Sequence, residues 1–144
     1  MYAVKRSALV NHSAQQMYEL VNDVARYQEF LPWCGGSRIV SEHESGYIAS
    51  ITISFKGINK SFSTRNDVVA NERTDMVLVD GPFSELAGNW QFVPLGEDSS
   101  KIALELKFGF SNRVVGAVVG PIFNSIADSM VDSFCKRADQ VYGH

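Results

Sequence analysis

Between Gly35 and Phe110 apolar and polar residues alternate along the chain, and this run limits the possible folds more than any motif. An alternation of period two is typical of β-strands that turn one face toward a core. Turn-forming residues divide the run into about six consecutive strands with no helical pattern between them. Such strands pair as an antiparallel meander, because parallel pairing needs long crossovers. The turn signals are Ser45-Gly46, Gly57, the polar stretch 71–75, Asp80-Gly81-Pro82 and the stretch 96–100.

One long helix is predicted from about residue 112 to residue 142, where apolar residues recur with a period near 3.6. Pro121 is expected either to start the regular part of this helix or to kink it, and Gly143 is expected to end it. The sheet has an apolar face that needs cover, and this helix is the only predicted element long and apolar enough to provide it. Its apolar stripe consists of Phe123, Ile126, Ala127, Met130, Phe134, Ala138 and Val141.

The N-terminal part predicts a first strand and two short helices. Residues 3–11 are rich enough in apolar and β-branched side chains for a strand. Ser13 with Gln16 three residues later matches a capping box at the start of a helix, and a second short helix should end at Pro32. The sequence therefore predicts one α+β domain over residues 1–144, with a curved antiparallel sheet of about seven strands around the long C-terminal helix.

Composition and motifs argue against several functions. The formal net charge of -3 and the pI near 5.5 speak against a broad basic surface, so DNA is not an expected partner. Cys34 and Cys135 have no metal-ligand spacing and the three histidines are scattered, so neither a metal nor another cofactor is expected. The sequence contains no phosphate-binding glycine loop, nucleophile elbow, HExxH or CxxC motif. A protein that is not an enzyme is expected.

The expected location is the cytoplasm, since the N-terminus has no secretory leader. The apolar run 114–123 is about half of the ~20 residues needed to span a bilayer. Within it, Gly116 and Gly120 form a GxxxG pattern that has two interpretations. It either packs closely against the sheet or forms an apolar flap over a cavity entrance. The second alternative would allow transient contact with a membrane surface and a peripheral position at the inner membrane.

A strongly curved sheet around one helix leaves a cavity wherever the facing side chains do not fill the space. Arg65 is a surface residue if its strand phase faces solvent, or offers a guanidinium to a ligand if that phase faces the cavity. Trp33 lies in a loop, where an aromatic side chain indicates a cavity mouth or a partner contact. The aromatic residues of the second half fit a core or a cavity equally well. The candidate ligand-binding residues are Trp33, Arg65, Phe83, Trp90, Phe92, Phe108, Phe110, Phe123 and Met130.

Three segments resemble one known family. Residues 27–34 are similar to its Tyr-Pro-x-Phe-Leu-Pro-Trp-Cys segment, residues 81–94 match GPFxxLxGxWxFxP, and residues 137–143 match RAxxVYG. Together with the Thr64-Arg65-Asn66 strand, these segments are distributed over nearly the whole length of the chain. The chain therefore resembles the coenzyme Q-binding and ribosome-association toxin group of the START-like, polyketide cyclase/lipid transport superfamily.

The resemblance implies a helix-grip fold with a hydrophobic tunnel. In the mitochondrial branch it implies ubiquinone binding in support of respiration. In the bacterial branch it implies binding to the large ribosomal subunit, which blocks subunit joining. The chain departs from the family pattern at Gln28, where proline is frequent, and at Gly109, where many members have glutamate.

The function expected from these observations is the non-catalytic binding of an apolar ligand by a carrier or chaperone, with a polyprenyl quinone such as ubiquinone as the ligand. The alternative is a ribosome-association toxin that binds the large ribosomal subunit. A polyketide cyclase is the third and least favoured hypothesis, because no residue can be nominated as its acid or base. The expected partners are a hydrophobic small molecule, the large ribosomal subunit under the alternative, and a membrane surface in passing.

Overall fold

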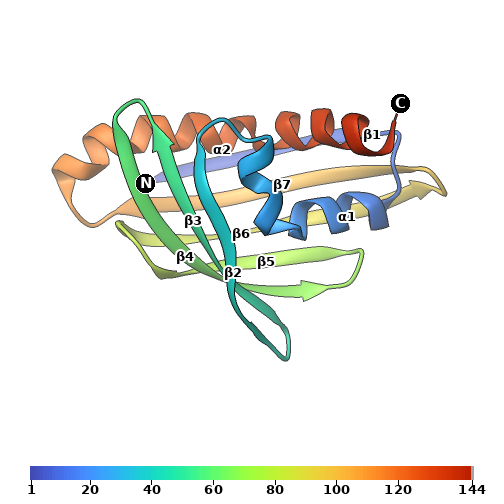
Figure 1. The fold of residues 1–144 in the computed structure, drawn as a ribbon, viewed down its shortest axis with the longest axis horizontal. Helices are drawn as coiled ribbons and strands as arrows, with labels where there is room; N and C mark the ends of the chain where they lie inside the picture. The colour runs from blue at the N-terminus through green and yellow to red at the C-terminus, as the bar shows by residue number, and fades with distance from the viewer. Residues whose placement is uncertain (144) are drawn as a thin grey trace.

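The computed structural model describes residues 1–143 of the chain. These residues form one sheet of seven strands in the spatial order β1-β7-β6-β5-β4-β3-β2, with a long helix across it (Figure 1). All neighbouring strands are antiparallel, so the predicted meander is confirmed. The strands are β1 (Tyr2–Val10), β2 (Cys34–His43), β3 (Gly46–Phe55), β4 (Ile58–Val69), β5 (Arg73–Asp80), β6 (Phe83–Gly96) and β7 (Ser99–Phe110).

Two short helices, α1 (Ala14–Asn22) and the 3-10 helix η1 (Val24–Glu29), connect β1 to β2. The predicted capping box starts α1. The Gln16 backbone N–H donates to Ser13 Oγ at 3.1 Å, and the Ser13 backbone N–H donates to Gln16 Oε1 at 3.0 Å. Two of the backbone donors that every helix start leaves open are thereby paired. Both short helices appear where the sequence predicts them.

The long helix α2 (Arg113–Tyr142) begins at Asn112, whose Oδ1 accepts from the N–H groups of Val114 and Val115. Pro121 lies inside this helix, so the first of its two alternatives, that it starts the regular part, is wrong. A proline inside a helix removes one N–H donor and its ring crowds the carbonyl of residue i−4, but Pro121 is exposed, where water can bind the freed carbonyl. Gly143 ends the helix with a φ of 86°, as expected.

The turn between β4 and β5 is shorter than the sequence suggests. The polar stretch 71–75 was expected to be a turn, but β5 already begins at Arg73. Arg73 and Asp75 lie on the outer face of the sheet, where Arg73 Nε is 3.1 Å from Asp75 Oδ2. Polar side chains on this face are compatible with a strand, because only the other face is buried.

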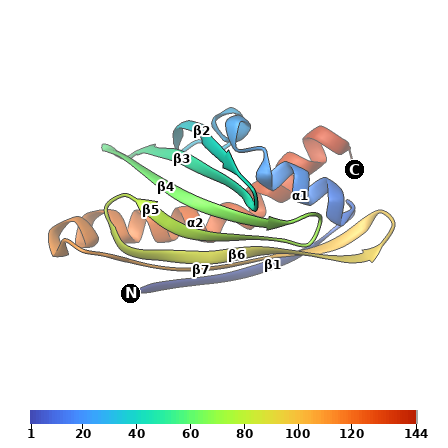
Figure 2. The same ribbon diagram turned by 90° about the horizontal axis from the view of Figure 1, so that it is seen from below.

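The sheet curves around α2, as Figure 2 shows from below, and the core lies between them. Phe108 of β7 is at its centre, fully buried, with ring centroids 4.7 Å from Phe123 of α2 and 5.1 Å from Tyr2 of β1. Gly120 lies directly against β1, since a Cβ there would be 2.4 Å from the Tyr2 hydroxyl oxygen. This contact supports the interpretation of Gly116 and Gly120 as a close-packing pair.

α2 also meets the length and composition of a membrane-crossing helix. An 18-residue window reaches a mean hydropathy of 1.5, and 33% of that window is buried inside the fold. The prediction made from the uninterrupted apolar run 114–123, that no stretch is long enough to span a bilayer, missed this longer window. Its buried residues pack on the sheet, as in the core helix of a globular protein.

Candidate apolar ligand cavity

A cavity of about 80 Å³ lies between the concave face of the sheet and α2. Its wall is formed by apolar, aromatic and a few uncharged polar side chains from both helices, η1 and most strands. The lining residues are Val21, Val24, Tyr27, Trp33, Tyr47, Ala49, Ile51, Phe62, Thr64, Asn66, Thr74, Met76, Leu86, Trp90, Leu104, Leu106, Phe123, Ile126, Ala127 and Met130.

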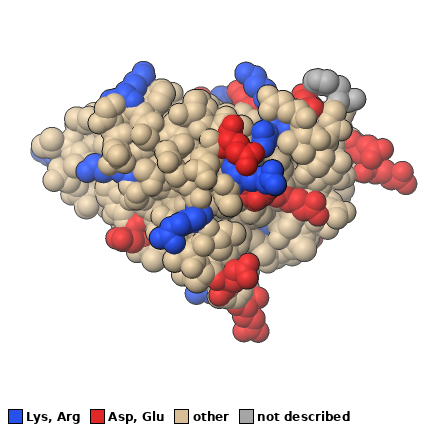
Figure 3. All heavy atoms as spheres, in the orientation of Figure 1, with Lys and Arg blue, Asp and Glu red and all other residues tan. Residues whose placement is uncertain are grey.

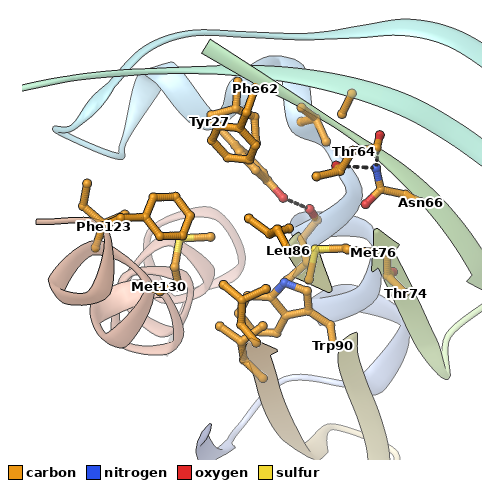
Figure 4. Close-up of a pocket in the computed structure, with 18 of the residues that line it drawn as sticks. Tyr27, Phe62, Thr64, Asn66, Thr74, Met76, Leu86, Trp90, Phe123 and Met130 are labelled. Atoms are coloured by element: carbon orange, nitrogen blue, oxygen red, sulfur yellow. Dashed lines mark hydrogen bonds between the residues drawn. The ribbon is translucent and has the colours of Figure 1, made fainter. Parts of the chain in front are cut away.

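The periodicities of the elements decide which side chains reach this cavity. On α2, Phe123, Ile126 and Met130 are three and four residues apart and therefore share one helical face. On the strands every second residue points inward, as Phe62, Thr64 and Asn66 do on β4. Figure 4 shows Phe123 and Met130 of α2 on one side of the cavity and Phe62, Thr64 and Asn66 of β4 on the other. Leu86 and Met76 lie between the β4 residues and Trp90.

Hydrogen bonds satisfy polar side chains at one part of the wall. Asn66 Nδ2 donates to the Thr64 carbonyl oxygen at 3.1 Å and to Thr64 Oγ1 at 3.0 Å (Figure 4). Asn22, at the end of α1, accepts through Oδ1 from Tyr47 Oη at 2.6 Å and from Thr74 Oγ1 at 3.0 Å. These two donors belong to β3 and β5, so Asn22 fastens α1 to the sheet beside the cavity.

The two ionisable groups of the wall are tyrosines, and both stay neutral. Burial raises the pKa of Tyr47 strongly, with a smaller contribution from the nearby Tyr18. Burial also raises the pKa of Tyr27, whose hydroxyl donates to the Val21 carbonyl oxygen. Within residues 1–143, no Asp, Glu, His, Lys, Arg or Cys lines the cavity. The wall therefore offers hydrogen-bond donors but no charge at neutral pH.

One buried donor in the wall lacks a partner. Trp33 is 6% exposed, and its indole Nε1–H has no hydrogen-bond acceptor within the described residues. Leaving a buried donor unpaired costs about 1–3 kcal/mol, so native proteins rarely do so without a reason. An oxygen atom supplied by a ligand would pair this N–H.

The structure brings four of the nine predicted ligand-binding residues to the cavity wall: Trp33, Trp90, Phe123 and Met130. The four other aromatic candidates, Phe83, Phe92, Phe108 and Phe110, do not line it. They pack against one another and against lining residues. Phe83 lies 5.5 Å from Phe62 and 5.0 Å from Phe123, and Phe92 stacks on Trp90 with ring centroids 6.4 Å apart. They form the core behind the wall.

Of the two alternatives for Arg65, the structure has the solvent-facing one, so Arg65 does not belong among the candidate ligand-binding residues. Its side chain is 50% exposed on the outer face of β4, where Nε lies 3.3 Å from Asp67 Oδ1. The alternate phase of this strand, with Phe62, Thr64 and Asn66, is buried instead. Arg65 points outward because the β4 residues that alternate with it form the more apolar face of the strand, and that face turns toward the core.

Sequence reasoning missed most of the wall. Tyr47, Ala49 and Ile51 are every second residue of β3, so the period-two pattern predicts that they share one face, but it does not identify them as cavity residues. Thr64, Asn66 and Thr74 are polar, and residue type alone does not distinguish a buried threonine from an exposed one. The period-two pattern was a usable signal for the β3 residues, and it was a weaker one for Thr64 and Thr74, which lie two residues from the apolar Phe62 and Met76.

Comparisons with known proteins define the family. The family model described as "Polyketide cyclase / dehydrase and lipid transport" matches residues 10–135, and the chain belongs to this family. A ribosome association toxin from Vibrio cholerae is 48% identical over 99% of both chains, and one from Pseudomonas aeruginosa is 46% identical over 97% of both. A mitochondrial coenzyme Q-binding protein homolog from Xenopus laevis is 27% identical over 95% of this chain and 58% of its own length.

Solved structures agree with this assignment. A START superfamily protein from Mycobacterium smegmatis superposes with a TM-score of 0.83, with 21% identity and coverage of 98% of this chain and 99% of that chain. An aromatase/cyclase from Streptomyces reaches a TM-score of 0.79 at 16% identity, covering 96% and 94%. At these identities the likeness shows the fold alone. The resemblance and the helix-grip fold expected from the sequence are confirmed.

Proposed function

We propose that this chain binds a polyprenyl quinone, such as ubiquinone, between the sheet and α2 and acts as its carrier or chaperone without converting it. The observation that supports this most is an uncharged apolar cavity beside a buried indole N–H that has no partner. A quinone combines an apolar body with carbonyl oxygens that accept hydrogen bonds. Trp33 Nε1–H can serve one of them, and a hydrocarbon ligand would leave it unpaired.

The ligand has to enlarge the cavity to enter it. Ligand sites usually measure about 300–1,000 Å³, and the cavity here is about 80 Å³. Met76 and Met130 stand on opposite walls, and unbranched methionine side chains adapt to new shapes at low energetic cost. Under this proposal the cavity of about 80 Å³ is a closed form of the site, and α2 with Met130 is the wall expected to move when a ligand enters.

The test is a titration of the purified protein with a short-chain ubiquinone, followed by tryptophan fluorescence. Both tryptophans of the chain, Trp33 and Trp90, line the cavity, so a bound quinone should quench the emission. Trp33→Phe should weaken binding about threefold to tenfold, the value of one net hydrogen bond. Trp90→Phe is the matched control, because it removes an indole from the same wall and leaves Trp33 in place. The absence of saturable quenching in the wild-type protein would refute the proposal.

The composition of the wall supports binding without catalysis. A cyclase needs an acid or base that reaches its substrate, and the described wall contains only two neutral tyrosines of raised pKa. Three solved aromatase/cyclases resemble this chain at 13–17% identity, which supports a common fold and not a common reaction. Recovery of unchanged ubiquinone after incubation with the protein is the expected result.

A second proposed function is association with the ribosome. It is supported by relatives named ribosome association toxins that are 44–48% identical over nearly the whole chain. The proposed location is accordingly the cytoplasm, with transient contact with the inner membrane when a quinone is taken up. Sedimentation profiles after overproduction test the ribosomal role. More free subunits and fewer joined ribosomes would support it, and unchanged profiles would remove it.

A further inference from the structure

The solvent-exposed side of α2 changes in character along the helix. From Asp128 to Gln140 the exposed residues are polar or charged, as in most surface helices, and Val141 in the last turn is the one exposed apolar residue after them: the polar ones are Asp128, Asp132, Lys136 and Gln140. In the first three turns the exposed residues after Arg113 are Val114, Ala117, Val118 and Pro121, and we refer to these four as the valine face. Val114 is 73% and Val118 57% exposed. The fold leaves this apolar face without cover.

Basic residues surround the same end of the molecule. Figures 1 and 2 both place the start of α2 and the turn between β3 and β4 at this end. That turn region carries Lys56 and Lys60, and α2 starts with Arg113. None of these three cations forms an ion pair within the described residues. In Figure 3 this end is mostly uncharged with Lys and Arg around it, and most of the visible acidic side chains lie farther away. Asp80 and Glu85 flank the neighbouring β5–β6 turn.

We propose that the valine face docks onto the surface of a bilayer that contains anionic lipids, with Lys56, Lys60 and Arg113 at the headgroups. Apolar side chains bordered by lysine and arginine are the features with which a helix lies in the membrane interface. Ribosomal RNA would attract the cations, but it would leave the valines against phosphates. A second copy of the chain would bring like charges together. Charge and hydrophobicity together therefore favour a lipid surface.

Docking in this orientation would place the cavity next to the lipid. Phe123 and Ile126 line the cavity and follow the valine face within two turns of the same helix. A movement of this part of α2 at the membrane would open the cavity toward the lipid in which a quinone is dissolved. This consequence rests on the proposed quinone binding, whereas the docking itself does not.

Flotation with quinone-free vesicles tests the docking. Wild-type protein should float with vesicles of phosphatidylcholine and phosphatidylglycerol and much less with phosphatidylcholine alone. Val114→Asp combined with Val118→Asp should lower the partition coefficient at least about tenfold, because two exposed apolar side chains no longer enter the interface. Val141→Asp is the matched control: Val141 is a 51% exposed valine at the other end of the same helix, and its replacement should leave flotation unchanged.

A second variant tests the electrostatic part without touching the valine face. Lys56→Gln combined with Lys60→Gln should lower binding to the anionic vesicles roughly 30-fold, since each basic residue near an anionic leaflet contributes a factor of about five. Binding to phosphatidylcholine alone should not change. Circular dichroism of all variants establishes that they are folded.

Several results would overturn the docking. The docking is refuted if the wild-type protein floats with neither kind of vesicle, or if the aspartate double variant floats like the wild type. Light scattering that shows a dimer converted to a monomer by the aspartate double variant would assign the valine face to self-association. Loss of ribosome binding with unchanged flotation would assign it to the ribosome. Because the vesicles contain no quinone, none of these results bears on the quinone titration, and failure of that titration leaves the docking intact.

Discussion

Filling the cavity from the helix side should stabilise the protein and abolish ligand binding together. Ala127 lines the cavity from α2 and is 2% exposed, and Ala127→Leu adds three carbon atoms there. At about 24 cal/mol per Å³, closing a cavity of 80 Å³ gains about 2 kcal/mol. Burial of three methyl or methylene groups at about 0.8 kcal/mol each gives a similar value. We therefore expect the free energy of unfolding to rise by about 2 kcal/mol.

The assay is urea unfolding combined with the ubiquinone titration. The unfolding midpoint should rise with an unchanged slope, and quenching by ubiquinone should be lost. Ala138→Leu is the control, because Ala138 is fully buried on the same helix away from the cavity. The same change there overpacks the core and should cost about 1–3 kcal/mol. The reasoning is refuted if Ala127→Leu destabilises the protein as much as Ala138→Leu does, or if it binds ubiquinone as tightly as the wild type.

Three further predictions concern the scaffold. Asn22→Ala should lower the free energy of unfolding, measured by urea denaturation, by about 2–3 kcal/mol, because the hydroxyls of Tyr47 and Thr74 lose their shared acceptor. A loss below about 0.5 kcal/mol would contradict the role of Asn22 in fastening α1 to the sheet. Burial holds the folded-state pKa of Tyr47 above the ordinary value of 10.0. Stability should therefore be fully present below about pH 10 and fall above it, and the fall should be smaller in Tyr47→Phe. Equal pH profiles of stability in the wild type and the variant would show that Tyr47 does not cause the fall. His12→Ala should cost about 1–3 kcal/mol, because His12 is 4% exposed and bonded to α2 through a 2.8 Å contact; unchanged thermal unfolding would show that this contact adds nothing.

The elements that sequence reasoning predicted well are those with a strong local signal. The Ser13 capping box, the apolar stripe of α2 and the hairpin at Gly46 each depend on residues a few positions apart. Errors arose where local signals were ambiguous. The stretch 71–75 is polar because its residues face outward from a strand, and Pro121 is tolerated within α2 because the long helix is held by packing against the sheet.

The site was less predictable because a cavity is a property of three-dimensional packing. Phe108 and Phe123 are both aromatic and buried, yet only Phe123 reaches the cavity. Which of them does so depends on how the sheet curves, and residue type does not reveal this. Trp33 was singled out as a loop aromatic and lies in the cavity wall, but its unpaired N–H cannot be seen from the sequence. For Arg65 the sequence left two alternatives open, because both phases of its strand contain polar residues.

Mass spectrometry of the protein under native conditions tests quinone binding most directly. The protein is purified without detergent from cells that make ubiquinone, and the masses of intact complexes are recorded. The structure predicts a complex with one quinone per chain in the wild-type protein and only the free protein for Ala127→Leu. A wild-type protein that carries no quinone, even after incubation with an excess, would contradict quinone binding in this cavity.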